Sequence, residues 1–423
     1  MKKLTNYTLI IMLMVIFVAC SSDDKYELTF PEVPTFVQVG KNELVIEETS
    51  KEEVSNGLEY SLYTIKKDAY RNDVFLKIHL VTLDITTSKY RPKILLAGEK
   101  MRDNKTPTGI AEYYTTATKN VVAAINGDYF HTGGDYIGLQ MGVQFYDNRL
   151  YKTGRGLVYA FDEADKPFIT TLSYELTAND MMINEVNEIR YGDYLVLFTP
   201  DFGLSTGTNP WGVELVLEPK DPNMKWEDTR TYKDLIYVVS EVRLEGTGNT
   251  PLTDTHLVLS GHGVAATKLK SYSVGDEIVL NLKVTDQNTG EDFKGKTTIG
   301  GSHHILINGK PSDFTLSGDD NEDALIVEMH PRSAIGHSAD AKKFFIVAVE
   351  GRLPYRSKGV DLPELADIMS YFGAHEAFNL DGGGSTFLHF NGRRVNWVPD
   401  QTSDDDPLAK LRVVPNAFCF VSE

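Results

Sequence analysis

A carboxylate followed by three glycines is the stretch of this sequence best suited to chemistry. Written in full, the stretch is Asn379-Leu380-Asp381-Gly382-Gly383-Gly384-Ser385-Thr386. Glycines give the backbone access to positive φ and remove the Cβ atoms that keep a ligand at a distance. A phosphate-binding P-loop would have Gly-Lys-Ser or Gly-Lys-Thr before a helix, and neither follows these glycines. The pattern predicts a carboxylate that substrate can approach closely; a glycine-rich hairpin with a solvated Asp is the alternative.

Four more clusters place polar residues beside apolar runs. They contain Asn126 and Asp128, His303 and His304, Arg332 and Ser333, and Glu350 and Arg352. Each cluster also has a structural explanation, because Asp128 could fix a turn and the arginines could form surface ion pairs. Adjacent histidines on a strand point to opposite faces, so the two histidines are poorly placed to share a metal ion. The occurrence of all these clusters in one chain favours a common site.

Together these residues suit a substrate with a sugar ring and a phosphate. Carboxylates can act at the anomeric carbon, and arginines and backbone amides bind an anion. A carboxylate beside the anomeric carbon can act as a nucleophile or as the base for a water molecule. We therefore expect Asp381, and then Glu350, as catalytic residues. The expected substrate contacts come from Asn126, Asp128, His304, Arg332, Ser333, Arg352, Asn379, Gly382, Gly383 and Ser385.

Local patterns predict a helix and a hairpin around the glycines. Asp361 and Glu364 form a capping-box pattern before an apolar helical repeat that stops at Gly373. Strands are expected at 376–380 and 385–390, the second closed by the turn signal Asn391-Gly392.

The segment 107–125 repeats this arrangement upstream. Residues 107–119 can form a helix, and 121–125 form a fully apolar strand, which is usually covered on both faces. Strand ends near Asn126, Gly309, Glu350 and Asp381 would deliver the polar clusters to the rim of a buried sheet.

The predicted fold class is α+β, with a mixed sheet core, few covering helices and a large β-rich insertion at about 170–290. Residues 101–423 would form the main domain. Residues 20–100 would form a tether and an N-terminal β-rich region, in which the two-periodic segment 58–96 suggests a hairpin leading into the core.

The first residues resemble a bacterial lipoprotein signal. Lys2 and Lys3 precede an apolar run too short to span a bilayer, and Phe17-Val18-Ala19-Cys20 resembles a lipobox. We expect residues 1–19 to be a signal peptide and Cys20 to be lipidated. The protein would be a cell-envelope lipoprotein of a Gram-negative outer membrane, exposed at the surface and held to the membrane through its lipid alone. An ordinary cleaved signal is the alternative.

The net charge and the cysteine content exclude some classes of binding partner and of covalent cross-link. A net charge of −18 disfavours nucleic acid as a partner, so phosphate recognition has to be local. With Cys20 acylated, Cys419 would have no disulfide partner and would be a small buried hydrophobe. We expect no cofactor. A metal-dependent phosphatase is disfavoured because no Asp/His array has metal-ligand spacing.

Four motifs occur in the order seen in the phosphodiester glycosidase family, that of N-acetylglucosamine-1-phosphodiester α-N-acetylglucosaminidase. They are Ala124 to Phe130, Pro331 to Gly336, Val349 to Arg352 with Ser357-Lys358-Gly359, and Asn379 to Thr386. The resemblance covers about residues 100–423. It implies hydrolysis of a sugar 1-phosphodiester, which releases the sugar and leaves a phosphomonoester. The partner would be a phosphorylated glycan or sugar phosphodiester, and a surface glycan-binding lipoprotein without catalysis is the alternative.

Overall fold

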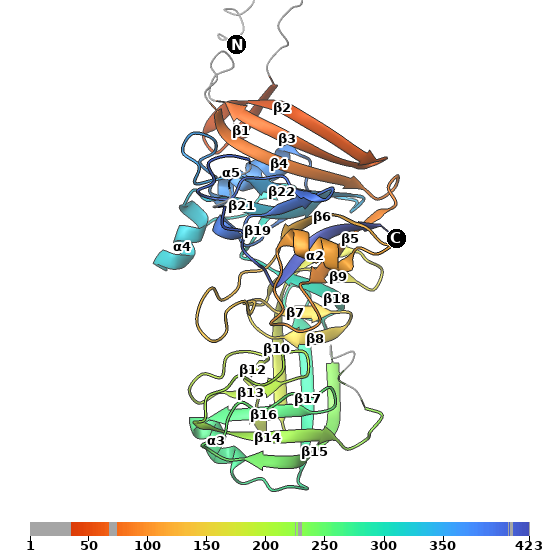
Figure 1. Cartoon of the computed structure of the whole chain (residues 1–423), viewed down its shortest axis with the longest axis vertical. Helices are drawn as coiled ribbons and strands as arrows, with labels where there is room; N and C mark the ends of the chain where they lie inside the picture. The colour runs from red at the N-terminus through yellow and green to blue at the C-terminus, as the bar shows by residue number, and fades with distance from the viewer. Residues whose placement is uncertain are drawn as a thin grey trace, which may run out of the picture. The chain divides into compact units, whose positions relative to one another are not determined.

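The computed structural model describes residues 35–66, 74–224, 226, 231–404, 406 and 409–422. The predicted signal peptide and Cys20 lie outside the described residues. Residues from Thr35 to Glu423 form one compact unit, so strands from both sides of residue 100 belong to the same body (Figure 1). Within the described part of the chain, no helix has the length and apolar character needed to cross a bilayer.

A nine-stranded sheet carries most of the predicted motifs. Its strands in spatial order are β1 (Thr35–Val39), β2 (Asn42–Ser55), β3 (Leu58–Lys66), β4 (Val74–Asp84), β22 (Lys343–Val349), β21 (Arg332–His337), β23 (Glu376–Asn379), β19 (His303–Ile307) and β20 (Lys310–Pro311). Helix α5 (Leu362–Tyr371) packs Leu365 and Ile368 into a core shared with this sheet. The predicted capping box of Asp361 and Glu364 is present at its start.

A five-stranded sheet lies against the first. Its order is β25 (Arg393–Arg394), β24 (Leu388–Phe390), β6 (Val121–Asn126), β26 (Asn416–Ser422) and β5 (Tyr90–Leu96). Every residue of β6 is buried, as its apolar sequence predicts. Helix α2 (Pro107–Tyr114), shorter than the predicted 107–119, packs Ile110 and Ala111 against β6 and β26. Asn391 and Gly392 both have positive φ in the turn between β24 and β25, as their type I′ hairpin signal predicts.

An aromatic core joins the two sheets. Phe378 and Phe344 from the nine-stranded sheet and Phe418 and Phe420 from the five-stranded sheet belong to one buried cluster. Because α5 and α2 cover the outer faces, the layers run helix, sheet, sheet, helix, and sheet-on-sheet packing of this kind needs a continuous apolar interior. The α+β class is therefore confirmed.

A ten-stranded sheet contains most of the remaining strands. It consists of β12 (Glu185–Val186), β13 (Leu195–Phe198), β16 (Leu257–His262), β14 (Gly212–Pro219), β15 (Thr231–Arg243), β17 (Glu277–Asp286), β10 (Pro167–Ala178), β9 (Leu157–Asp162) and β18 (Gly295–Gly300), with β11 (Met181–Met182) beside β10. Strands β7 (Gln144–Tyr146) and β8 (Arg149–Lys152) form a separate hairpin, and α3 (Gly263–Leu269) packs on β16 and β14. The status of this β-rich region as an insertion stays a prediction.

The two core sheets differ from the predicted mixed sheet, because their described ladders are all antiparallel. The parallel ladder, β12 with β13, belongs to the ten-stranded sheet. Short turns such as the one between β2 and β3 connect neighbours directly, whereas parallel neighbours need long crossovers.

Because neighbouring strands are antiparallel, the first residue of one strand lies beside the last residue of the next, at the same end of the sheet. Arg332 at the start of β21 lies opposite Val349 at the end of β22, and Asn379 at the end of β23 lies opposite His303 at the start of β19. Gly309, which follows the end of β19, lies at the other edge, where its N–H donates to the His375 carbonyl at 2.7 Å. The candidate site therefore takes the start of β19 and not its end.

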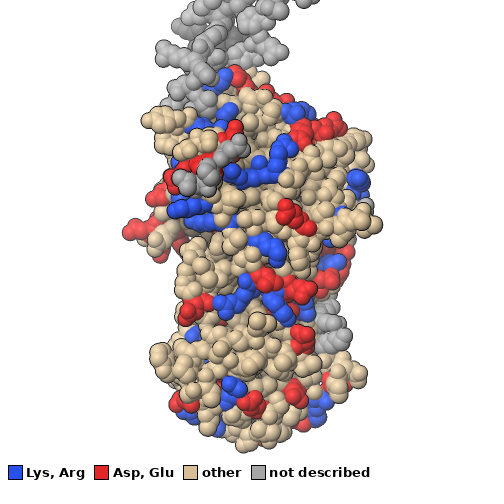
Figure 2. All heavy atoms as spheres, viewed as in Figure 1, with Lys and Arg blue, Asp and Glu red and all other residues tan. Residues whose placement is uncertain are grey.

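Charged side chains are interspersed on the face of the molecule shown in Figure 2. Acidic side chains gather over α4 (Asp320–Val327), whose first turn contains Asp320, Glu322 and Asp323. The net negative charge of the sequence is therefore not spread evenly, and basic side chains lie between the acidic ones on this face.

Candidate functional site

The stretch Asp381–Ser385, which we name the glycine turn, spans the gap between the two core sheets. The Asp381 N–H donates to the Gly127 carbonyl at 2.9 Å, and the Gly383 N–H donates to the Pro331 carbonyl at 2.9 Å. Gly383 has a φ of 60° and opens a short 3₁₀ turn, Gly383–Ser385. A glycine is favoured at this φ, so the sequence matches the geometry.

Two arginines lie against the glycines of this turn. A Cβ atom on Gly383 would be 3.5 Å from Nη1 of Arg352, and one on Gly384 would be 2.7 Å from Cζ of Arg412. Gly384 therefore makes room for the Arg412 guanidinium group, whereas a Cβ atom on Gly383 would be at ordinary van der Waals distance from Arg352. Arg352 was an expected site residue; Arg412 was not, although it lies in the last polar cluster before β26.

Asp381 is a partly exposed carboxyl with a perturbed pKa. Burial raises its pKa to about 6, although a hydrogen bond from Ser385 and the charge of Arg412 act in the opposite direction. A carboxyl group with a pKa near neutrality can both lose and accept a proton at physiological pH.

Asp128 supplies a second carboxyl group with a perturbed pKa. It is buried, and its Oδ2 accepts a hydrogen bond from the Gly142 N–H at 2.8 Å. Cβ atoms on Gly142 and Gly300 would be 2.5 and 2.4 Å from this oxygen, so both glycines make room for the carboxyl group. Burial raises the pKa of Asp128 to about 7, and the charge of Asp381 adds to the effect.

Asn126 and Ser333 are engaged within the protein. Nδ2 of Asn126 donates to the Asp381 carbonyl at 2.6 Å, while its Oδ1 accepts from Ser333 Oγ at 2.7 Å and from the Phe387 N–H at 3.1 Å. Asn126 thus ties β6, β21 and both ends of the glycine turn together. The structure gives both residues a role in shaping the turn.

Arg332 is almost completely buried at the same edge. Its Nε donates to the Val360 carbonyl at 3.0 Å, and its Nη2 donates to the Leu325 and Glu328 carbonyls at 2.8 Å each. Among the described residues, no group accepts a hydrogen bond from its Nη1. A fixed guanidinium group with one nitrogen to spare can bind an anion.

A set of neutral polar groups adjoins Arg332. Asn379 Nδ2 donates to Ser302 Oγ at 2.8 Å and to the Tyr129 hydroxyl at 3.3 Å. Asn379 Oδ1 and His303 Nδ1 are buried without a hydrogen-bond partner among the described residues. Burial lowers the pKa of His303 and the charge of Arg332 lowers it further. Unpartnered buried polar atoms at a sheet edge are typical of groups that contact a ligand or water.

His304 points away from this set. Its Nε2 lies 2.6 Å from Oε2 of Glu376, which also contacts His375. Since successive side chains of a strand face opposite sides, His303 and His304 cannot both reach the site. The histidine that faces the site is His303. The sequence of two adjacent histidines does not indicate which one faces the site, because that depends on the strand register.

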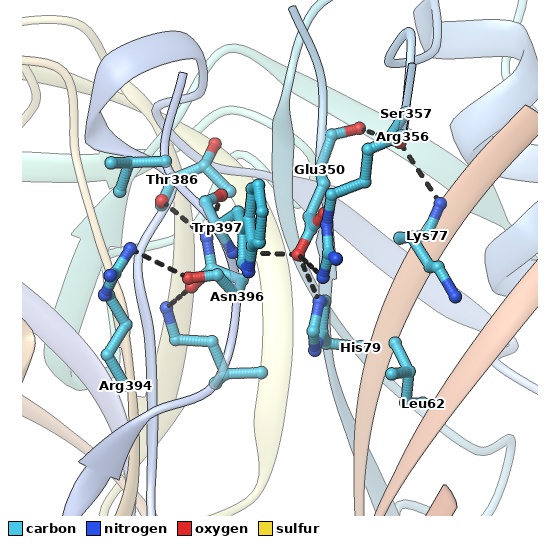
Figure 3. Close-up of polar contacts among 12 residues, drawn as sticks. Leu62, Lys77, His79, Glu350, Arg356, Ser357, Thr386, Arg394, Asn396 and Trp397 are labelled. Atoms are coloured by element: carbon cyan, nitrogen blue, oxygen red, sulfur yellow. Dashed lines mark hydrogen bonds and ion pairs between the residues drawn. The ribbon is translucent and has the colours of Figure 1, made fainter. Parts of the chain in front are cut away.

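Glu350 occupies a different environment, shown in Figure 3. Its side chain has 0% exposure, and its oxygens contact His79 Nε2 at 2.9 Å, Arg356 Nη2 at 3.0 Å and the Trp397 N–H at 2.8 Å. Burial alone would raise its pKa, but the hydrogen bonds and charges of His79 and Arg356 hold the pKa at about 2. The Glu350 carboxylate is therefore the centre of a saturated ion cluster.

The groups that remain available converge on the glycine turn. They are the Asp381 carboxyl, the guanidinium groups of Arg352 and Arg412, Nη1 of Arg332 and the polar set around Asn379. Burial and the charge of Asp381 also raise the pKa of Tyr129, whose hydroxyl contacts Asn379. Among the described residues, no group of three or more His, Cys, Asp or Glu side chains is arranged to hold a metal ion. The arrangement can bind an anion next to an ionisable carboxyl group.

Two known structures share this fold at low sequence identity, and a third is less similar. A protein from Synechocystis matches with a TM-score of 0.63 and 18% identity over 87% of this chain, which spans 62% of that protein. An exported protein from Burkholderia pseudomallei matches with a TM-score of 0.63 and 19% identity over 82% of this chain and 74% of its own. The catalytic domain of zebrafish N-acetylglucosamine-1-phosphodiester alpha-N-acetylglucosaminidase has a TM-score of 0.44 at 14% identity, covering 88% of this chain and 86% of its own.

At the level of sequence, the chain matches one family model. No curated protein sequence matches this chain. The family model for phosphodiester glycosidases matches residues 240–421, which include Arg332, Arg352, the glycine turn and Arg412 but not Asp128. The resemblance of this chain to the phosphodiester glycosidase family is thereby confirmed over residues 240–421.

Proposed function

We propose that this protein is a hydrolase that cleaves a sugar 1-phosphodiester, releases the sugar and leaves a phosphomonoester on the acceptor. One observation carries the proposal: Arg352 and Arg412 lie directly against the glycines that follow Asp381. A phosphate bound between these guanidinium groups would have its sugar substituent beside the carboxyl group. The family match over residues 240–421 supports the same reaction class.

In the proposed reaction, the bond between the anomeric carbon and the phosphate oxygen breaks. Its electron pair stays on the phosphate oxygen, where Arg352 and Arg412 stabilise the added charge. The oxygen of water ends on the anomeric carbon, and Asp381 acts as nucleophile or as the base that takes the water proton. Ionised Asp381 favours the protonated form of Asp128, so the pair divides into one base and one acid.

Glu350 has a different role in this proposal. Because its oxygens are saturated by His79, Arg356 and Trp397, it is a positioning residue for the loop that carries Arg352. Ser357 Oγ, which donates to the Glu350 carbonyl and accepts from the Lys77 N–H at 3.1 Å, connects the same loop to β4.

The test compares two substrates with the purified mature protein. One is the methyl phosphodiester of N-acetylglucosamine α-1-phosphate and the other is an aryl α-glycoside of the same sugar, with free sugar as the readout. We expect the phosphodiester to be cleaved faster. Release of phosphate without sugar would indicate a phosphatase, and saturable binding without any release would favour a glycan-binding protein. A chelator arm measures metal dependence.

We also propose that Cys20 is lipidated and that the lipid holds the protein in the outer membrane. The lipobox-like stretch Phe17-Val18-Ala19-Cys20 supports this. Metabolic labelling with an alkyne fatty acid should mark the wild type and not Cys20→Ala, and labelling of both would contradict the proposal.

A further inference from the structure

A cavity of about 560 Å³ adjoins the glycine turn on the side of Arg352. Its lining includes Lys77, Arg352, Tyr355, Arg356 and Trp397. Arg352 belongs to both places, because its guanidinium group also lies 3.5 Å from the Cβ position of Gly383. A molecule bound at the glycine turn can therefore extend into this space.

The cavity is basic within an acidic protein. Among the described residues, neither Lys77 nor Arg352 has a carboxylate within ion-pair distance; Lys77 Nζ donates to Thr64 Oγ1 at 2.5 Å, and Arg352 contacts His330 at 3.0 Å. Burial lowers the pKa of Lys77 and the charge of Arg356 lowers it further, although the charges of Glu350 and Glu47 act in the opposite direction. The acidic member of the lining is Asp400, which leaves an excess of positive charge.

An aromatic wall completes the cavity. The Trp397 ring is held in place, since Cζ of Arg356 lies 4.1 Å from the ring centroid and Nε1 donates to Asp404 at 2.7 Å. Figure 3 shows the Trp397 side chain between Asn396 and the Glu350 cluster. Tyr355 is fully exposed at the cavity lining. Exposed aromatic surface beside a cavity is typical of a ligand-binding site.

We propose that this cavity is the subsite for the acceptor side of the phosphodiester, and that it takes an acceptor carrying a second negative charge. The proposal rests on the proposed function. With the scissile phosphate at the glycine turn and its sugar beside Asp381, the other ester substituent leaves past Arg352 toward Trp397. A second phosphate or carboxylate on that substituent would bind near Lys77, whose ammonium group has no carboxylate within ion-pair distance among the described residues.

The test uses two substrates that share the N-acetylglucosamine α-1-phosphoryl group. One is esterified with methanol and the other with glycerol that carries a phosphate, and kcat/KM is measured for each with wild type and Lys77→Ala. We expect the wild type to prefer the second substrate, and Lys77→Ala to reduce that preference about fivefold, the upper range for a partly exposed charge pair. Added salt should also reduce the preference. Lys268→Ala, an exposed lysine on α3, is the matched control and should keep the wild-type ratio.

A binding measurement keeps this inference separate from the proposed function. Calorimetry with glycerol 3-phosphate should give a binding constant for wild type that is about fivefold weaker in Lys77→Ala, whether or not either diester is hydrolysed. Hydrolysis of both diesters with equal efficiency, or binding unaffected by Lys77→Ala, would overturn the acceptor subsite. Binding that depends on Lys77 without hydrolysis would leave the subsite in place and count against the proposed reaction.

Discussion

Asp381 and Glu350 both follow a core strand, precede glycine and have an arginine nearby, yet their pKa values are shifted in opposite directions. Asp381 is partly exposed and has a pKa raised to about 6, whereas Glu350 is inaccessible and has a pKa of about 2. The difference lies in the partners. Glu350 has His79, Arg356 and the Trp397 N–H as donors, whereas Asp381 has the Ser385 hydroxyl and the Gly382 N–H, with only the charge of Arg412 added. Saturation by donors fixes a carboxylate in place, and a shortage of donors leaves it able to react.

The largest effect should come from Asp381→Asn. We expect kcat to fall by about 10²–10⁴-fold, the usual contribution of a group that transfers a proton or attacks, while the melting temperature stays close to that of wild type. Steady-state kinetics and thermal unfolding measure the two. Asp180→Asn, at an exposed position, is the control. A variant with full activity would refute the catalytic assignment of Asp381.

Replacing Glu350 should affect stability. Glu350→Gln removes the buried carboxylate that contacts Arg356, whose side chain is 26% exposed, and we expect the free energy of unfolding to fall by about 1.5–3 kcal/mol, as for other lost hydrogen bonds to a charged group. Urea unfolding measures this change, with the exposed Glu43→Gln as control. If unfolding is unchanged and kcat drops, Glu350 would be the reacting carboxylate and the contrast would be reversed.

Arg412→Ala should weaken recognition of the anion. Loss of a charge-assisted contact costs about 1.5–3 kcal/mol, so we expect kcat/KM for the phosphodiester to fall by about 10–100-fold. Hydrolysis of the aryl glycoside should change much less. The ratio of these two rates is the measurement, and an equal loss for both substrates would show that Arg412 does not bind the phosphate.

The smallest expected effect concerns the free energy of unfolding as a function of pH, to which Glu350 and Asp381 contribute slopes of opposite sign. Glu350 has a depressed pKa, so the stability it contributes is present above its unfolded pKa of about 4.3 and is lost as pH falls toward 2. Asp381 has a raised pKa, so folded protein binds its proton more tightly and stability falls as pH rises from about 4 to 6.

Unfolding midpoints from pH 2 to 7 can separate these contributions. Glu350→Gln should flatten the acidic limb of the wild-type curve. Asp381→Asn should reduce the slope between pH 4 and 6, where Asp128 supplies the remaining slope because its pKa is also raised. If both variants change the same limb, the pKa values of the two carboxyl groups are not shifted in opposite directions.

Local sequence patterns predicted much of the secondary structure and part of the site. The capping box of Asp361, the buried strand β6 and the Asn391-Gly392 turn are encoded by neighbouring residues, so a short window contains the information. Asp381 was identified for the same reason, because the three glycines follow it directly in the chain.

Strand pairing could not be predicted in this way. The pairing of β4 with β22 joins residues 78–84 to 343–349, and no local pattern specifies such a partner. Without the register, no local pattern distinguishes His303 from His304, indicates that His79 donates to Glu350, or places Arg412 against Gly384. Each of these depends on contacts between residues distant in the chain.

The hydrogen bonds of Asn126 have a consequence for the order of assembly. This side chain joins residues 207, 255 and 261 positions away, from both core sheets. Contacts of such long range form late, because the chain must first close large loops. Either sheet could acquire its hydrogen bonds alone, but the glycine turn takes its shape only when the two sheets dock. Enzymatic competence would then be among the last properties to appear during folding, and a fragment lacking either sheet would be inert.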